Sequence, residues 1–157
     1  SATLMRLANP ANQSRLTVDS AGTVLARGTL LVGPQVNPGD GSMLLWYPAR
    51  AALRAGTVTG GKWDHASVGA QSVALGGEVT ASNTGSVAIG SGSAATGGYA
   101  VALGRDAVAS GSVSHAIGYS AQASGSHALA LGPHTQATGS YTISMGRYST
   151  ATSADAT

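Results

Sequence analysis

Residues 86–99 read SVAIGSGSAATGGY, and residues 100–113 repeat the same phrase as AVALGRDAVASGSV. The phrase recurs every fourteen residues without an insertion, and one glycine ends its apolar part each time. These glycines are Gly76, Gly90, Gly104, Gly118, Gly132 and Gly146. A strict short period indicates one small structural unit stacked on itself, so this part of the chain is predicted to be a solenoid.

Large and small residues alternate in the first half of each unit. The large positions, the second and the fourth, hold Val73, Leu75, Val87, Ile89, Val101, Leu103, His115, Ile117, Leu129, Leu131, Ile143 and Met145. Alternation with a period of two is typical of a β-strand. The glycine that follows suits a turn with positive φ.

The second half of each unit is built from small residues. Its tenth position is always alanine, its eleventh is serine or threonine, and its twelfth is usually glycine. This pattern predicts a second strand and a second turn. Two strands of roughly five residues and two turns of about two would complete one coil, with coils stacked about 4.8 Å apart through parallel ladders. Six such coils would make a rod about 29 Å long.

The alternation also predicts which side chains point inward. Short turns hold the two strands close together, so the narrow interior suits alanine, serine and threonine. The large residues then form an outward stripe that is too extensive to leave in water, and we expect it to bury against sister chains. A chain with 23 glycines and no phenylalanine also has few residues for a conventional core. The alternative places the large residues inside the coil and leaves the chain monomeric.

The units of residues 72–157 resemble the head repeats of trimeric autotransporter adhesins, the YadA-like family, whose phrase is close to S-V-A-I-G followed by spaced Ala and Gly. The resemblance implies an all-β fold, a left-handed parallel β-roll, and three chains around one axis with the large residues at the trimer interface. It also implies a place on the bacterial surface at the outer membrane, with a role in virulence. The last unit departs from the pattern at Ser153 and Asp155, so either the roll ends there or a neck follows.

Residues 1–41 are not repetitive and are expected to form a β-hairpin and strand region. Residues 15–19 and 23–26 alternate on either side of a Ser20-Ala21-Gly22 turn, which predicts a hairpin. Residues 30–32 predict a third strand. The chain starts at Ser1 without a methionine, and we expect it to be a fragment whose export signal and anchor lie outside it.

Residues 42–71 are predicted to lead into the roll and to cap it, so that its open end does not pair with other chains. A helix over 49–55 is possible by propensity, but Pro48 and Gly56 confine it, and strands are favoured. The pattern resembles the lead-in to rolls in adhesins and phage tail fibres. Trp46 and Trp63 could offer a sugar-stacking platform, but we favour a plug at the end of the roll or a subunit contact.

No catalytic or metal-binding set is apparent, and we expect neither enzymatic activity nor a cofactor. The chain has no cysteine and no G-x-S-x-G, P-loop or H-E-x-x-H motif. Asp64 and His65 are adjacent, but neighbours on a strand face opposite ways. The repeat region is almost uncharged, which argues against nucleic acid. No apolar run reaches membrane-spanning length, so we expect no membrane contact by this fragment.

The turns carry most of the chemical variety, and a ligand-contact surface is expected there. Its candidate residues are Tyr99, Arg105, Tyr119, His127, His134, Tyr141, Arg147 and Tyr148. His115 replaces an aliphatic residue of the stripe. If three copies meet in an interface, protonation at about pH 5–6 would loosen the head; the alternative is a tolerated polar substitution.

The sequence therefore predicts a non-enzymatic fragment of a surface adhesin. The resemblance implies a homotrimer that attaches to host extracellular-matrix proteins or to a cell-surface receptor. Two other classes stay open at this point, a phage tail-fibre segment and an ice-binding solenoid. An ice-binding solenoid requires a regular ladder of threonines. The eleventh position holds both serine and threonine, so it provides such a ladder only in part.

Overall fold

The computed structural model describes residues 3–8, 14–19, 24–26 and 39–155. Over these ranges the chain forms strands and two short 3-10 helices, and no α-helix. The first three strands, β1 (Thr3–Ala8), β2 (Ser14–Asp19) and β3 (Val24–Ala26), make an antiparallel sheet. β2 and β3 pair antiparallel, with Thr17 opposite Leu25, as expected for two strands of a hairpin, and the predicted turn at Ser20-Ala21-Gly22 lies outside the described residues. The third strand expected at 30–32 lies outside the described residues.

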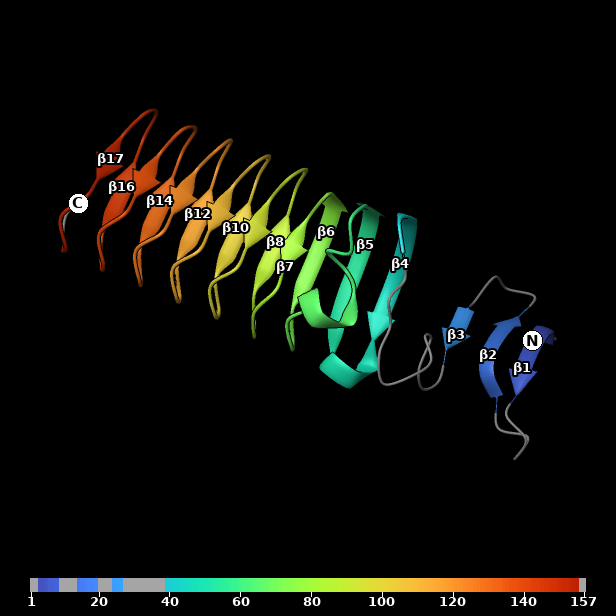
Figure 1. The fold of residues 1–157 in the computed structure, drawn as a ribbon. Coiled ribbons are helices and arrows are strands. Elements are labelled where there is room, and N and C mark those ends of the chain that lie inside the picture. The colour runs from blue at the N-terminus through green and yellow to red at the C-terminus, as the bar shows by residue number, and fades with distance from the viewer. Residues whose placement is uncertain (1–2, 9–13, 20–23, 27–38, 156–157) are drawn as a thin grey trace.

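Two parallel sheets form a solenoid over the repeats, shown as a stack of flattened coils in Figure 1. The first sheet contains β6 (Val73–Gly77), β8 (Val87–Ile89), β10 (Val101–Leu103), β12 (His115–Ile117), β14 (Leu129–Leu131) and β16 (Ile143–Met145). The second contains β7 (Thr80–Ala81), β9 (Ala94–Ala95), β11 (Val108–Ala109), β13 (Gln122–Ala123), β15 (Gln136–Ala137) and β17 (Thr150–Ala151). Each strand pairs in register with the strand one coil away, as Ala102 does with Ala88 and Ala116.

The strands are shorter than the sequence pattern predicts. Most strands of the first sheet have three residues and those of the second have two, whereas roughly five were expected. The difference arises in the turns, because the seventh and fourteenth positions adopt left-handed backbone. Asp106 has a φ of 55° and Val113 a φ of 56°. These residues reverse the chain, so the turns occupy a larger part of each coil than two residues.

The interior of the roll is made of small side chains, as the alternation predicts. The middle residue of each first-sheet strand from Ala74 to Ala130 is fully buried, and so are most alanines of the second sheet. The large residues lie on the outer surface instead, where Ile89 is 39% and Met145 is 61% exposed. The alternative with the large residues inside the coil is therefore wrong.

Glycine is required where successive coils approach each other most closely. A Cβ added at Gly104 would lie 2.5 Å from the carbonyl oxygen of Gly118, and the φ of Gly104 is +129°. On the other side of the coil, a Cβ at Gly111 would lie 2.0 Å from the carbonyl oxygen of Gly125. The repeated glycines therefore allow the backbone of one coil to stack directly on the next.

A longer coil precedes the repeats. The hairpin of β4 (Gly41–Tyr47) and β5 (Ala52–Val58) joins the first sheet at its N-terminal end, with β5 parallel to β6 and β4 antiparallel to β5. Short 3-10 helices at Pro48–Arg50 and His65–Ser67 flank β5. The helix considered over 49–55 does not form: β5 begins at Ala52, in agreement with the strands favoured there, and only Pro48–Arg50 adopts a short 3-10 helix.

The register shows that this first coil contains six extra residues. Leu53 pairs with Val73, a separation of 73 − 53 = 20, whereas Gly69 lies against Asn83, a separation of 83 − 69 = 14. The six extra residues therefore lie between Leu53 and Gly69, in the part of the chain that contains Trp63. Trp63 is fully buried, and its indole N–H donates to the carbonyl oxygen of Val79 at 3.0 Å. It therefore offers no face to a sugar, whereas Trp46 on β4 is 39% exposed.

Arg54 occupies the place in the first coil that alanine occupies in the repeats, because it pairs with Ala74. Its side chain is fully buried. One guanidinium nitrogen donates to the carbonyl oxygens of Leu53 and Ser72, and the other donates to Ser72 Oγ at 2.7 Å and the carbonyl oxygen of Ala81 at 2.8 Å. Burial lowers the pKa of Arg54 to about 10, so the side chain stays charged at neutral pH. No carboxylate among the described residues pairs with it.

Replacing Arg54 with methionine is expected to leave the free energy of unfolding unchanged or to raise it, by up to about 3 kcal/mol. Methionine fills most of the same volume without a buried charge, and the carbonyl oxygens of Ser72 and Ala81 keep their bonds from the N–H groups of Leu53 and Gly69. Arg54→Ala should lose about 2–3 kcal/mol because it leaves a cavity. Urea denaturation at pH 7 measures both. A methionine variant as unstable as the alanine variant would contradict the expectation.

Candidate binding surface

The described residues contain no arrangement typical of a catalytic or metal site. No group of three or more histidines, cysteines, aspartates or glutamates could hold a metal ion within these ranges. His65 is engaged within the first coil, where its ring packs edge-on against Tyr47 at 5.7 Å and hydrogen bonds with that residue's hydroxyl. No helix in the described part of the chain is long and apolar enough to cross a membrane. The contact residues predicted in the turns and the large residues of the first sheet lie at the surface of the roll.

The predicted contact residues fall on two opposite edges of the roll. One edge, which we name the arginine–tyrosine edge, contains Arg105, Tyr119, His134, Arg147 and Tyr148, all in the turns that lead from the first sheet to the second. The other, the second turn edge, contains Tyr99, His127 and Tyr141, in the turns that lead back. Because the coils stack in register, side chains at equivalent positions form ladders along each edge.

The side chains of the arginine–tyrosine edge form a continuous series of contacts. The Arg105 guanidinium carbon lies 5.5 Å from the Tyr119 ring centre. The Tyr119 and His134 rings meet edge-on at 4.9 Å, and the His134 and Tyr148 rings stack at 4.8 Å with an angle of 9°. The Arg147 guanidinium carbon lies 4.8 Å from the Tyr148 ring centre. The structure thus brings together the five predicted residues, which the sequence pattern had placed only in the turns.

The second turn edge is less continuous. The His127 and Tyr141 rings stack at 4.8 Å with an angle of 9°, and His127 Nδ1 lies 3.0 Å from Ser126 Oγ. Tyr99 is separated from this pair by the coil of Val113 and lies close to Gly85 instead, where an added Cβ would be 2.5 Å from its ring. The structure therefore joins two of the three predicted residues on this edge.

The outer face of the first sheet is the apolar stripe, the twelve large residues from Val73 to Met145 named above. All of them are half-buried or exposed in the single chain. His115 lies within this stripe, half-buried, with Val101 and Leu129 as its ladder neighbours. The outer face of the second sheet is polar by contrast, and every serine or threonine at the eleventh position is exposed. The roll therefore has one apolar and one polar broad face.

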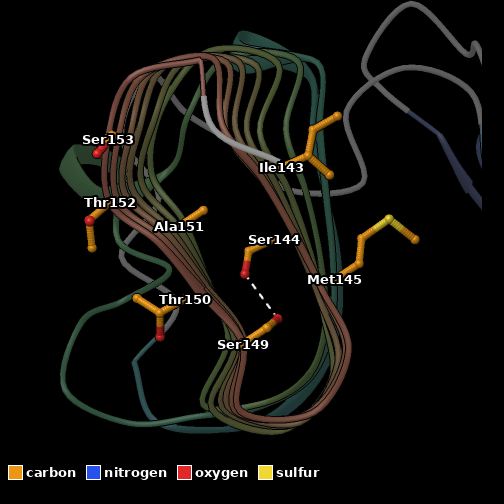
Figure 2. A pocket seen from close by; sticks show the side chains of 8 residues that line it. All are labelled: Ile143, Ser144, Met145, Ser149, Thr150, Ala151, Thr152 and Ser153. Carbon is orange, nitrogen blue, oxygen red and sulfur yellow. Dashed lines mark hydrogen bonds between the residues drawn. The ribbon is translucent and has the colours of Figure 1, made fainter.

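The C-terminal end of the roll has a hollow of about 370 Å³. Figure 2 shows that its lining comes from both strands of the last coil, with Ser144 and Ser149 facing each other across the interior. Their hydroxyl oxygens lie 3.0 Å apart. Nothing lies within 4 Å of a Cβ added at Gly146, in contrast to Gly104 in the middle of the roll. The hollow therefore lies on the last described coil and is not an enclosed site.

Parallel coils of fourteen residues, with alanine inside and a stripe of large residues outside, define a two-sheeted β-solenoid. The family model of the YadA head domain repeat, in two copies, matches residues 67–93, 95–112 and 114–135. The match supports a YadA-like head at residues 67–135 and confirms the resemblance seen in the sequence. A comparison with curated proteins found no significant match. Beyond the matched residues, the same coil geometry continues to β17.

Proposed function

We propose that this roll is the non-enzymatic head of a homotrimeric adhesin on the bacterial outer membrane, with left-handed coils and three chains around one axis. The observation that carries the proposal is the apolar stripe, which the single chain leaves uncovered along six successive strands. A contiguous apolar surface of this kind is typical of a protein–protein interface. The YadA head repeats at 67–135 support the same assembly.

In this proposal the head attaches the cell to host extracellular-matrix proteins or to a cell-surface receptor. The stripe faces the sister chains, so the turn edges and the polar face are left to contact a partner. Equivalent residues recur along the roll and on each of three chains. Individually weak contacts would therefore add up through multivalency without any single deep pocket. The first coil, with β4 and β5, would cap the N-terminal end of the assembly.

Sedimentation of the purified chain tests the proposed trimer. We expect the parent chain to sediment as a trimer and the double variant Ile89→Lys, Leu103→Lys to sediment as a monomer, because six lysines would be buried in the apolar interface. The control variant Ser110→Lys adds a lysine on the polar face, where Ser110 is exposed, and should remain a trimer. We expect the trimeric parent and control to attach to surfaces coated with collagen, fibronectin or laminin, and the monomeric double variant to lose this attachment. A monomeric parent chain would contradict the proposal.

An ice-binding solenoid is less well supported by the polar face. The eleventh position supplies exposed Thr96, Thr138 and Thr152, but the other three coils have serine there. The neighbouring ninth position includes exposed Gln122 and Gln136, which interrupt a regular threonine surface. No observation favours a phage tail fibre beyond the lead-in pattern of residues 42–71. The adhesin head is therefore the function proposed.

A further inference from the structure

We infer that the arginine–tyrosine edge binds an acidic polysaccharide, a linear carbohydrate that carries sulfate or carboxylate groups. The inference rests on the proposed function, since it names the chemistry of the partner that an adhesin head would contact. The first observation that supports it is the distribution of charge along the roll. Residues 72–157 contain only two basic side chains, Arg105 and Arg147, and both lie on this edge.

The chemistry of the edge is that of hydrogen-bond donors. The rings of His134 and Tyr148 cover each other's faces, and Tyr119 meets His134 edge-on. The groups left to a ligand are therefore tyrosine hydroxyls, ring edges and guanidinium N–H groups. Aromatic edges carry the positive part of the ring quadrupole, and guanidinium matches sulfate and carboxylate oxygens. Asp106 is the one carboxylate in these contacts, and it lies 3.2 Å from Arg105.

The two arginines are held in position by their rings. Arg105 lies over Tyr119 and Arg147 lies over Tyr148, so part of the entropy cost of ordering each side chain is already met before a ligand binds. The residues are nevertheless accessible, since Tyr119 is 44% and Tyr148 is 61% exposed. The edge is thus pre-organised and open along its length.

The spacing favours a polymer over a single small anion. Arg105 and Arg147 belong to coils three steps apart, which corresponds to about 14 Å along the axis. Tyr119 and His134 lie between them and offer hydrogen-bonding groups. Acidic groups separated by hydroxyl-bearing sugar rings fit this order of an arginine, hydrogen-bonding side chains and a second arginine. An acidic peptide would present carboxylates without the intervening hydroxyl groups.

Retention of the 157-residue chain on immobilised heparin, a sulfated polysaccharide, tests the inference. Arg147→Gln should weaken binding about tenfold or more, because a charge-assisted contact is lost. Lys62→Gln also removes one positive charge, but from a side chain that pairs with Glu78, in the turn five coils before that of Tyr148, and should change binding less than about twofold. Tyr148→Phe keeps the ring beneath Arg147 and should have a smaller effect than Arg147→Gln.

Equal losses of heparin binding in Arg147→Gln and Lys62→Gln would show attraction by net charge alone and would overturn the inference. Equal or tighter binding of poly-L-glutamate at the same salt concentration would favour an acidic peptide and would also overturn it. A trimer that binds matrix proteins but is not retained on heparin overturns this inference and leaves the proposed adhesin standing. A monomer with Arg147-dependent retention overturns the proposed trimer and supports the site.

Discussion

The variant Ala102→Leu is expected to lose about 3 kcal/mol of unfolding free energy, which is a large fraction of the total stability of a marginally stable chain. Ala102 is fully buried in a core made almost entirely of alanine. Its ladder neighbours are Ala88 and Ala116, so the added carbons have no larger cavity to enter. Both flanking coils would have to move apart, and their parallel hydrogen bonds would lengthen.

Val101→Leu is the matched control for this experiment. Val101 is the preceding residue on the same strand, but its side chain is on the outer face and only half-buried. The same new residue should therefore cost less than about 1 kcal/mol there. Circular dichroism with urea denaturation measures both variants. If Ala102→Leu proved as stable as Val101→Leu, the interior would have more room than the coordinates indicate, and the small-residue core would not explain the repeat.

Trp63→Ala is expected to lose about 3–5 kcal/mol. Trp63 is the largest fully buried side chain among the described residues, and its N–H group satisfies the carbonyl oxygen of Val79. Alanine would leave a cavity in the first coil and remove that hydrogen bond. Because each coil contacts mainly its neighbours, the damage should concentrate at the N-terminal end of the roll.

Hydrogen exchange resolves where the Trp63→Ala variant opens. Amides of β5 and β6 should exchange much faster than in the parent chain, whereas those of β12 and β14 should keep most of their protection. Trp46→Ala makes the same change at a side chain that is 39% exposed and should show a clearly smaller loss of stability. Similar losses in both variants, or uniform loss of protection along the roll, would contradict the expected role of Trp63.

The repeats could be predicted from the sequence because their period and alternation are both strict. The order of large, small and large residues around Ala88 places that alanine and Ile89 on opposite faces, since successive strand residues face opposite ways. The short turns, which leave only a narrow interior, favour the alanine inside. Strand length was less predictable. Val113 and Asp106 adopt left-handed backbone, but neither is glycine, so composition gives no signal that the turns begin there.

The first coil was harder to predict because its insertion breaks the period. Leu53-Arg54-Ala55-Gly56 has the same spacing of large residue and glycine as Val73-Ala74-Leu75-Gly76, yet it lies twenty residues earlier. An arginine at the inner position also conflicts with the rule that buried charges are rare. An alignment on the spacing of the large residue and the glycine, with no constant period required, places Arg54 at the position of the interior alanines.

The sequence also contains the spacing that predicts the ring contacts. His127 and Tyr141 are fourteen residues apart, and so are His134 and Tyr148. In a stack of fourteen-residue coils such pairs must lie directly above one another. The placement of these residues in turns was correct, and their stacking follows from the same period.

The reversed direction of β4 has a consequence for polymerisation. A stack of identical parallel coils offers the same template at both ends, so one molecule could in principle add to the next and grow into a filament. Here β4 runs antiparallel to β5 at the edge of the first sheet. A coil of another molecule that ran parallel to the repeats would meet β4 as an antiparallel partner, so the parallel ladder of the repeats does not continue across this edge.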